Sequence, residues 1–172
     1  LDQYMGNATQ ACELILGTLN KSASLIRSFK RIALTEARSE RRRFDLATHV
    51  ADIAHAVTQT LDDIPCVPQV DVHAGITMDS YPEAVHEVLQ HLIHNAQLHG
   101  GLARTPAGAV HISATALEDP WIALSVRDNG TGVPAAHLGR IFDPFFTTKK
   151  GTGSNGLGLN VVHNLVTNVL GD

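Results

Sequence analysis

The first forty residues show an apolar pattern that recurs in steps of three and four. Residues 5–38 contain no proline, and their glycines are Gly6 and Gly17. This spacing places side chains along one seam of a helix, as in a coiled coil, and does not fit a strand. We therefore predict a long coiled-coil-like helix over 5–38. Its seam residues are Cys12, Ile15, Leu19, Ser22, Ile26, Phe29 and Ala33.

A charged stretch, Glu36 to Arg43, follows this helix, and we interpret it as a solvated linker rather than a binding patch. After it, Asp45 is the predicted N-cap of a second helix. The apolar face of this second helix consists of Leu46, Val50, Ile53, Val57 and Leu61. The chain is thus divided near residue 43 into two parts, 1–43 and 44–172.

The middle of the chain alternates between strand and helix patterns. Residues 69–73 fit a short edge strand, and residues 82–99 have the periodicity of an amphipathic helix. Residues 110–117 and 121–128 each alternate apolar and polar positions, with a turn between them. This arrangement predicts two neighbouring antiparallel strands.

The last part begins with a long segment, 129–156, that is rich in Gly, Thr, Asn and Lys and lacks sustained periodicity. A loop of this length inside a compact domain is usually functional. An apolar helix is predicted over 157–169. The elements together predict an α+β fold: a two-layer α/β sandwich, in which a mixed sheet is covered by three helices.

Composition narrows the class of protein. Of the 172 residues, 44% are hydrophobic and 17% charged, and the net charge is −4. This balance gives no general attraction to nucleic acid or to anionic membranes, so we expect contact with neither. The chain has no apolar run of about 18 residues, as a membrane span requires. Its two cysteines, Cys12 and Cys66, indicate neither a disulfide framework nor a zinc site.

Four polar blocks follow one another after residue 80. In the first, His91, Asn95 and His99 are four residues apart and form one ridge of the 82–99 helix, beside its apolar face. Such a ridge is well placed to line a pocket, although an ordinary solvated face would look the same.

The second block is Asp128-Asn129-Gly130-Thr131-Gly132. Asp128 has the same parity as Ile122, Leu124 and Val126, so we expect its carboxylate on the buried side of the sheet. A buried carboxylate requires donors, and an adenine amino group would supply one. A hairpin turn at Asn-Gly is the alternative, but the Val-Pro-Ala-Ala that follows starts a helix rather than a strand.

The third block, 141–150, contains three phenylalanines and ends in Lys149 and Lys150. The aromatic side chains could dock a mobile loop or simply anchor it, and the lysines could meet phosphate. The fourth block, 151–159, places four glycines around the start of the last helix. Glycines there let backbone N–H groups approach phosphate oxygens, with the helix dipole favouring the anion.

In this order the four blocks resemble the N, G1, F and G2 boxes of the ATP-binding domain shared by histidine kinases, DNA gyrase, MutL and heat-shock chaperone ATPases. Residues 140–149, RIFDPFFTTK, are similar to the F box of bacterial sensor histidine kinases. The resemblance covers the whole chain, because 1–43 resembles the second helix and linker of the kinase dimerisation domain. It also implies that the C-terminal strands of the sheet are missing after Asp172.

The resemblance implies ATP and Mg²⁺ as ligands. Asn95 would hold Mg²⁺, Asp128 would hold the adenine, and the segment from Thr131 to Asn155 would be the ATP lid. His91 and Asn95 would be the catalytic positions. The implied ATP-binding residues are Asn95, His99, Asp128, Gly130, Gly132, Thr147, Lys149, Lys150, Gly153, Gly156, Leu157 and Gly158.

Three positions depart from the family pattern. His91 stands where the kinases usually have Asn, Asp or Glu and where the gyrase group has its hydrolytic Glu. Ser154 stands in place of a glycine, and Leu98 in place of a frequent Lys. The change at position 91 bears on the rate and on the identity of any general base.

The implied reaction is transfer of the ATP γ-phosphoryl group to a histidine, followed by relay to a response-regulator aspartate. The phosphoacceptor histidine is expected outside this chain, because the His86-Glu87 pair lies inside the 82–99 helix. The expected partners are a second copy, through helix 5–38, and a receiver domain. The fragment is expected in the cytoplasm, with anchoring of its parent protein in the inner membrane left open. Two other functions stay open: a gyrase- or MutL-type ATPase, and a degenerate nucleotide-binding or docking module.

Overall fold

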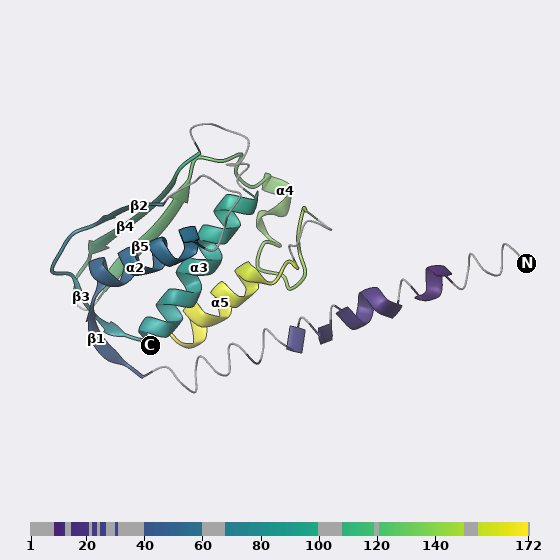
Figure 1. Cartoon of the computed structure of the whole chain (residues 1–172), viewed down its shortest axis with the longest axis horizontal. Helices are drawn as coiled ribbons and strands as arrows, with labels where there is room; N and C mark the ends of the chain where they lie inside the picture. The colour runs from purple at the N-terminus through teal and green to yellow at the C-terminus, as the bar shows by residue number, and fades with distance from the viewer. Residues whose placement is uncertain are drawn as a thin grey trace, which may run out of the picture.

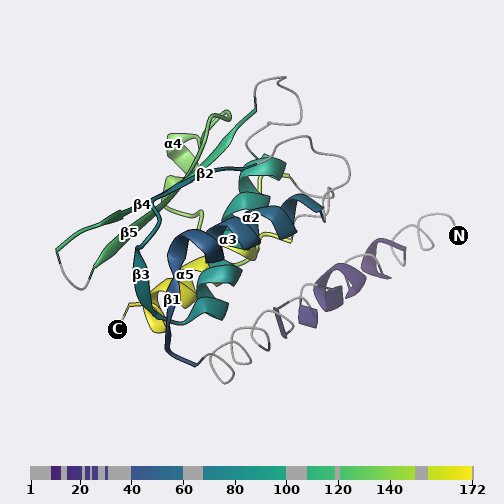
Figure 2. The ribbon, with the colours of Figure 1, turned by 60° about the vertical axis from the view of Figure 1, so that its left-hand side comes forward.

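The computed structural model describes residues 9–12, 15–20, 22–23, 25–26, 30, 40–59, 68–99, 108–118, 121–149 and 155–171. Each described residue between 9 and 30 is helical, and both ribbon views show this part apart from the domain that follows (Figures 1 and 2). Ile15, Leu19 and Ile26 of the predicted seam are 60%, 60% and 67% exposed. Phe29 and Ala33 lie outside the described residues.

The strands of the domain form two small sheets. β1 (Arg42–Asp45) pairs with β3 (Thr77–Ser80) in an antiparallel ladder. The larger sheet has the order β2 (Gln69–Val72), β4 (Val110–Ala116), β5 (Ile122–Asp128). β2 is parallel to β4, and β4 is antiparallel to β5, so this sheet is mixed and β5 forms one of its edges.

The helices lie on one face of the larger sheet (Figures 1 and 2). α2 (Leu46–Gln59) and α3 (Pro82–His99) pack against the strands, and α5 (Gly158–Asn168) lies beside α3. A single-turn helix, α4 (Ala135–Leu138), follows β5. The two-layer α/β arrangement predicted from the sequence is therefore confirmed.

Two apolar clusters hold the helices in place. The larger joins α2, α3 and the sheet, and its fully buried side chains include Leu46, Ile53, Leu89, Ile93 and Ile112. The smaller joins α3 to α5 through residues such as Val88, Val161 and Leu165. α3 belongs to both clusters, which explains why apolar residues recur along its whole length.

The predicted cap of α2 is confirmed. Asp45 Oδ1 accepts hydrogen bonds from the Thr48 backbone N–H at 2.8 Å and from the Thr48 hydroxyl at 2.7 Å. These bonds satisfy a backbone donor that the first turn of a helix leaves unpaired. They also stabilise the ionised carboxylate, which lowers the pKa of Asp45.

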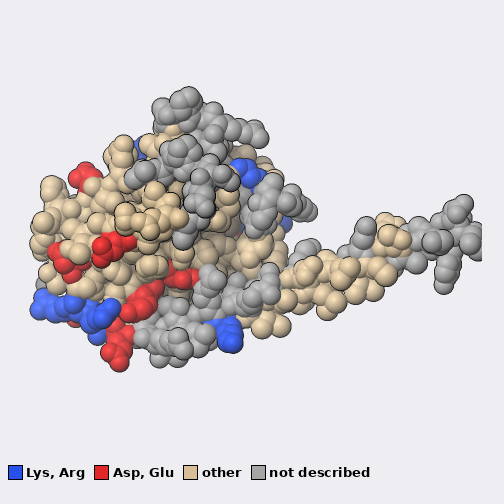
Figure 3. Space-filling model, in the orientation of Figure 1, with Lys and Arg blue, Asp and Glu red and all other residues tan. Residues whose placement is uncertain are grey.

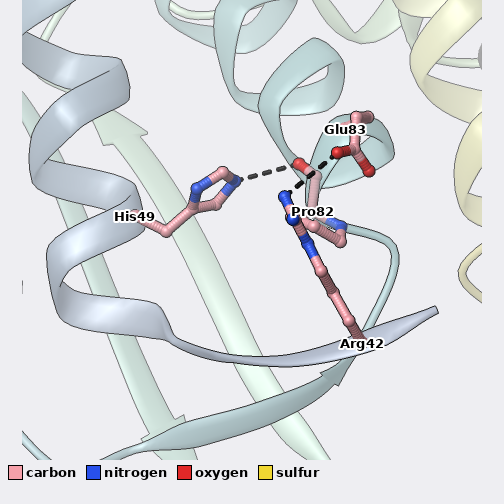
Figure 4. Close-up of polar contacts among 4 residues, drawn as sticks. All are labelled: Arg42, His49, Pro82 and Glu83. Carbon is pink, nitrogen blue, oxygen red and sulfur yellow. Dashed lines mark hydrogen bonds and ion pairs between the residues drawn. The ribbon is translucent and has the colours of Figure 1, made fainter. Parts of the chain in front are cut away.

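The last residues of the predicted solvated linker, Glu36 to Arg43, are exposed as expected, but Arg42 and Arg43 belong to β1 and not to a linker. The Arg42 guanidinium is 3.1 Å from Glu83 Oε1, and the ring of His49 donates from Nε2 to the carbonyl of Pro82 at 2.9 Å (Figure 4). Arg41 reaches Asp79 at 3.4 Å. Basic and acidic side chains accordingly gather together at the corner formed by β1 and β3 (Figure 3). Glu83 and Asp79 thus balance the charge of the arginines in and beside β1. The run of arginines is the reason that the sequence did not indicate a strand here.

Candidate functional site

A cavity of about 500 Å³ opens between α3, the segment after β5, and the start of α5. It brings together parts of the first three sequence blocks and a residue that directly follows the glycines of the fourth. Its lining residues are Asn95, Thr131, Gly132, Val133, Pro134, His137, Ile141, Phe146, Thr147, Thr148, Lys149 and Leu159. Four of the predicted site residues therefore line one cavity, although they come from three separate segments of the sequence: Asn95, Gly132, Thr147 and Lys149.

Asn95 is half-buried on α3 and lines the cavity. His91, one turn earlier, is also half-buried, and its Nε2 lies 3.4 Å from Glu87 Oε1. A Cβ atom added to Gly158 would lie 3.4 Å from His91 Nδ1, so the ring faces the first residue of α5. His99 is the last residue of α3, and its side chain lies outside the described part of the chain.

The expectation that Asp128 has a buried carboxylate, on the same side of the sheet as Ile122, Leu124 and Val126, is wrong as regards burial. Ile122, Leu124 and Val126 are half-buried as predicted, but Asp128 ends the strand and is exposed. Its Oδ1 accepts the Gly130 N–H at 2.9 Å. The alternation of apolar and polar residues predicts on which side of the sheet a side chain lies, but not how deeply it is buried. At the end of β5 the covering helices no longer exclude water.

The residue after Asp128 extends the sheet. Asn129 Oδ1 accepts the Ala109 N–H at 2.8 Å, and the Asn129 N–H donates to the Ala109 carbonyl at 3.3 Å. The chain then passes through Gly132, at φ +69°, into α4 rather than into a returning strand. The hairpin alternative for this block is thereby excluded, and the predicted helix start after Val133 is confirmed.

The aromatic block is anchored to α5. The Phe142 carbonyl accepts the side-chain amide N–H of Asn160 at 3.0 Å, and the rings of Phe142 and His163 are 5.2 Å apart. Phe146 contacts the His137 ring at 5.4 Å and lies 4.9 Å beneath the Arg140 guanidinium. These contacts hold one wall of the cavity in a defined position.

The backbone at Gly156 passes very close to the backbone of the aromatic block. A Cβ atom on Gly156 would lie 2.6 Å from the Phe145 carbonyl carbon and 2.7 Å from the Phe146 carbonyl oxygen. Gly156 and Phe145 both have φ of 66°. The structure therefore requires glycine at 156 for a backbone crossing, a reason that the phosphate-loop pattern did not reveal.

Lys149 lies in the cavity wall with its ammonium group on the carbonyl of Leu98, in the last turn of α3. A cation is favoured there by the helix dipole. The Lys149 backbone N–H also donates to the Thr147 hydroxyl at 3.1 Å. Lys150 and Gly153, which we also expect to contact ATP, lie outside the described residues.

The start of α5 is the remaining part of the site. Leu157 is buried, and its N–H donates to Asn155 Oδ1 at 3.2 Å. Gly158 is then the first residue of the helix and lies beside His91.

The pKa of His94, on α3, is lowered. The main cause is the loss of surrounding water, and the second is the neighbouring His91.

Several cavity residues were not singled out by the sequence. Leu159 is the last residue of the fourth block, and Val133, Pro134 and His137 belong to the predicted lid segment, but none of the four was predicted to contact ATP. Within the described ranges, no group of three His, Cys, Asp or Glu side chains could hold a metal ion. The described helices likewise include none with the length and apolar character of a membrane span.

A two-layer α/β domain whose cavity lies between an asparagine on α3, Gly132 and the loop 146–149 fits a nucleotide-binding ATPase. The sequence model of the histidine kinase-, DNA gyrase B- and HSP90-like ATPases matches residues 80–172, and the chain belongs to this family. Within the family its relatives are sensor kinases, which supports the histidine kinase catalytic domain over the gyrase or MutL alternative.

Two curated relatives illustrate the similarity. The two-component sensor PprA of Pseudomonas aeruginosa is 40% identical over 93 residues, which cover 52% of this chain and 10% of PprA. The sensor histidine kinase RcsC of Escherichia coli (strain K12) is 28% identical over 173 residues, which cover 92% of this chain and 17% of RcsC. The chain thus spans only a small part of these relatives.

Among solved structures, the Acinetobacter baumannii histidine kinase AdeS matches with a TM-score of 0.60 and 27% identity. The match covers 88% of this chain and 70% of the AdeS chain. The fold and the family predicted from the four blocks are therefore confirmed.

Proposed function

We propose that this chain binds ATP with Mg²⁺ in the cavity beside Asn95 and donates the γ-phosphoryl group to a histidine on a dimerisation domain. The phosphoryl group then passes to an aspartate of a response-regulator receiver domain. The observation that carries the proposal is the convergence of Asn95, Gly132 and the 146–149 loop on one cavity.

The residues at the cavity fit these ligands. Pockets for small ligands are commonly about 300–1,000 Å³, and this one is about 500 Å³. Mg²⁺ prefers oxygen ligands and keeps several waters when it binds nucleotide phosphates, so one amide oxygen from Asn95 is a sufficient protein ligand. Magnesium would neutralise phosphate charge during the transfer.

On this proposal the chain's own residues act mainly by positioning. The exposed Asp128 carboxylate is available to accept the adenine amino group, and Gly130 holds that carboxylate in place. The Gly158 N–H at the start of α5 would face the phosphates, and the Leu157 N–H would exchange Asn155 Oδ1 for a phosphate oxygen. Phosphoryl transfer depends on such placement and on charge stabilisation more than on covalent chemistry by the protein.

The remaining proposed contacts surround the phosphates. Thr147 and Lys149 line the cavity, and Lys149 would exchange the Leu98 carbonyl for a phosphate oxygen. His99, Lys150, Gly153 and Gly156 complete the proposed set, and His91 with Asn95 forms its catalytic part. The exposed apolar residues Ile15, Leu19 and Ile26 support a homodimer through the N-terminal helix.

A phosphotransfer assay tests the proposal. The chain is incubated with γ-labelled ATP, Mg²⁺ and a separate dimerisation domain that carries its histidine. We expect label on that domain only when the chain is present and Asn95 is intact. Release of phosphate at the same rate without an acceptor would instead indicate a hydrolytic ATPase. ATP binding with neither transfer nor hydrolysis would indicate the degenerate module.

A further inference from the structure

Glu87 and His91 form an acid–imidazole pair on α3, one turn before Asn95. Their side chains are 15% and 20% exposed, and Glu87 Oε1 lies 3.4 Å from His91 Nε2. The Nε2 atom is buried, and the described residues give it no better hydrogen-bond partner. A buried ring nitrogen next to a carboxylate is expected to carry the proton, because a carboxylate only accepts hydrogen bonds.

The other ring nitrogen of His91 faces the opposite way. Nδ1 lies 3.4 Å from the position of a Cβ on Gly158, the first residue of α5. A Cβ at this distance would be in van der Waals contact with the nitrogen, and the glycine leaves that space beside Nδ1 unfilled. When Nε2 carries the proton of a neutral imidazole, Nδ1 must be an acceptor.

We infer that Glu87 is a positioning residue that fixes the tautomer of His91. The Glu87 carboxylate retains the proton on Nε2, and Nδ1 is thereby presented as a hydrogen-bond acceptor toward the N-terminus of α5. Such an acceptor can receive a hydrogen bond from a water of the Mg²⁺–phosphate group. The hydrogen bond from a water to Nδ1 rests on the proposed ATP site. The tautomer of His91 concerns the chain without nucleotide.

Nitrogen NMR of the histidine rings tests the tautomer directly in the nucleotide-free chain. The spectrum is recorded near pH 8.5, about two units above the reference histidine pKa of about 6.5. The His91 signals are assigned by their absence in His91→Gln. We expect the Nε2–H tautomer in the unmodified chain and in Glu87→Gln, whose amide oxygen still accepts. In Glu87→Ala we expect a mixture of the two tautomers.

Glu83→Ala is the matched control, because Glu83 lies on the same helix and pairs with Arg42 instead of a histidine. It should leave the His91 tautomer unchanged. An Nδ1–H tautomer in the unmodified chain would overturn the inference, and so would an unchanged tautomer in folded Glu87→Ala. If Glu87→Ala does not fold, the spectra of the unmodified chain and of Glu87→Gln still decide.

Calorimetry with Mg²⁺·ATP tests the hydrogen bond to Nδ1. Only the Nε2–H fraction of Glu87→Ala can accept a hydrogen bond at Nδ1, so binding should weaken by the inverse of the fraction seen in the spectrum, about twofold for an equal mixture. Glu87→Gln and Glu83→Ala should bind as the unmodified chain does. A shifted tautomer with unchanged affinity would overturn the role of Nδ1 in binding. Failure of the unmodified chain to bind ATP would refute the proposed function and the role of Nδ1, but not the tautomer result.

Discussion

Gly156→Ala is expected to be the most destabilising glycine substitution in the site. The change adds a methyl group at 2.6 Å and 2.7 Å from backbone atoms of Phe145 and Phe146, and both are below any normal contact distance. Backbone cannot rotate away as a side chain would. The residue must also keep a φ of 66°, which costs an L-residue roughly 1–2 kcal/mol.

The expected magnitude combines these terms. Forcing extra volume into a packed site typically costs about 1–3 kcal/mol, and replacing glycine returns about 0.4–1 kcal/mol through the unfolded state. The net loss is about 3 kcal/mol, which corresponds to a fall in Tm of roughly 6–12 °C for a chain of this size. Urea unfolding followed by circular dichroism would measure the loss.

Two other glycines separate the steric cost from the conformational cost. Gly132 has a φ of 69° but no atom within 4 Å of an added Cβ, so Gly132→Ala should cost only about 1 kcal/mol. Gly139 has an ordinary helical φ of −71° and the same free space, so Gly139→Ala should be neutral or slightly stabilising. Equal losses for Gly156→Ala and Gly132→Ala would refute the argument from the backbone crossing.

Four further predictions concern the site, the cap of α2 and the N-terminal helix. Asp128→Asn should abolish ADP binding in calorimetry while the circular dichroism spectrum stays unchanged, because an amide N–H would then face the adenine amino group. Unaltered affinity would make Asp128 a turn residue only. Asn95→Ala should reduce the Mg²⁺-dependent part of ATP affinity more than the affinity for nucleotide without metal. The same Mg²⁺ dependence before and after the change would remove Asn95 as the metal ligand. The pKa of Asp45 is lowered in the folded chain, so the ionised carboxylate stabilises the fold. This stabilisation should be complete above the unfolded-state pKa of about 3.9 and should disappear as the pH falls through the lower folded-state pKa. Melting curves should therefore show a smaller acid-induced fall in Tm for Asp45→Asn, and an identical fall would contradict the capping role. Ile26→Glu should make the chain monomeric in sedimentation without changing ATP affinity, and a persistent dimer would place the interface elsewhere.

The sequence was most informative where one physical constraint acted along a continuous segment. The predicted 82–99 helix coincides with α3, because its apolar stripe meets buried neighbours on two sides. The β4–β5 pair was also predicted correctly, since each strand buries alternate residues against the helices.

Features that depend on distant partners could not be predicted in this way. β1 and β3 were missed because their sequences, RRFD and TMDS, are mainly polar, and in each strand a single apolar residue, Phe44 or Met78, packs against the core. The depth of Asp128 depends on where the covering helices end. Similarly, the need for glycine at 156 arises from Phe145, which lies in another block. The order of the motifs along the chain was enough to predict the candidate site. The walls of its cavity could not be predicted, because they are formed by tertiary contacts.

The position of β5 at the edge of its sheet affects how self-association of the chain should be measured. Within the described part of the chain, β5 pairs only with β4, so the backbone N–H and C=O groups on its other side are available to a second strand. Exposed strand edges of this kind promote pairing between molecules. Trp121, 61% exposed beside the first residue of β5, adds an apolar contact at the same edge. Two molecules could thus join through strand edges as well as through helices, so the oligomeric state should be measured with the two kinds of contact kept apart.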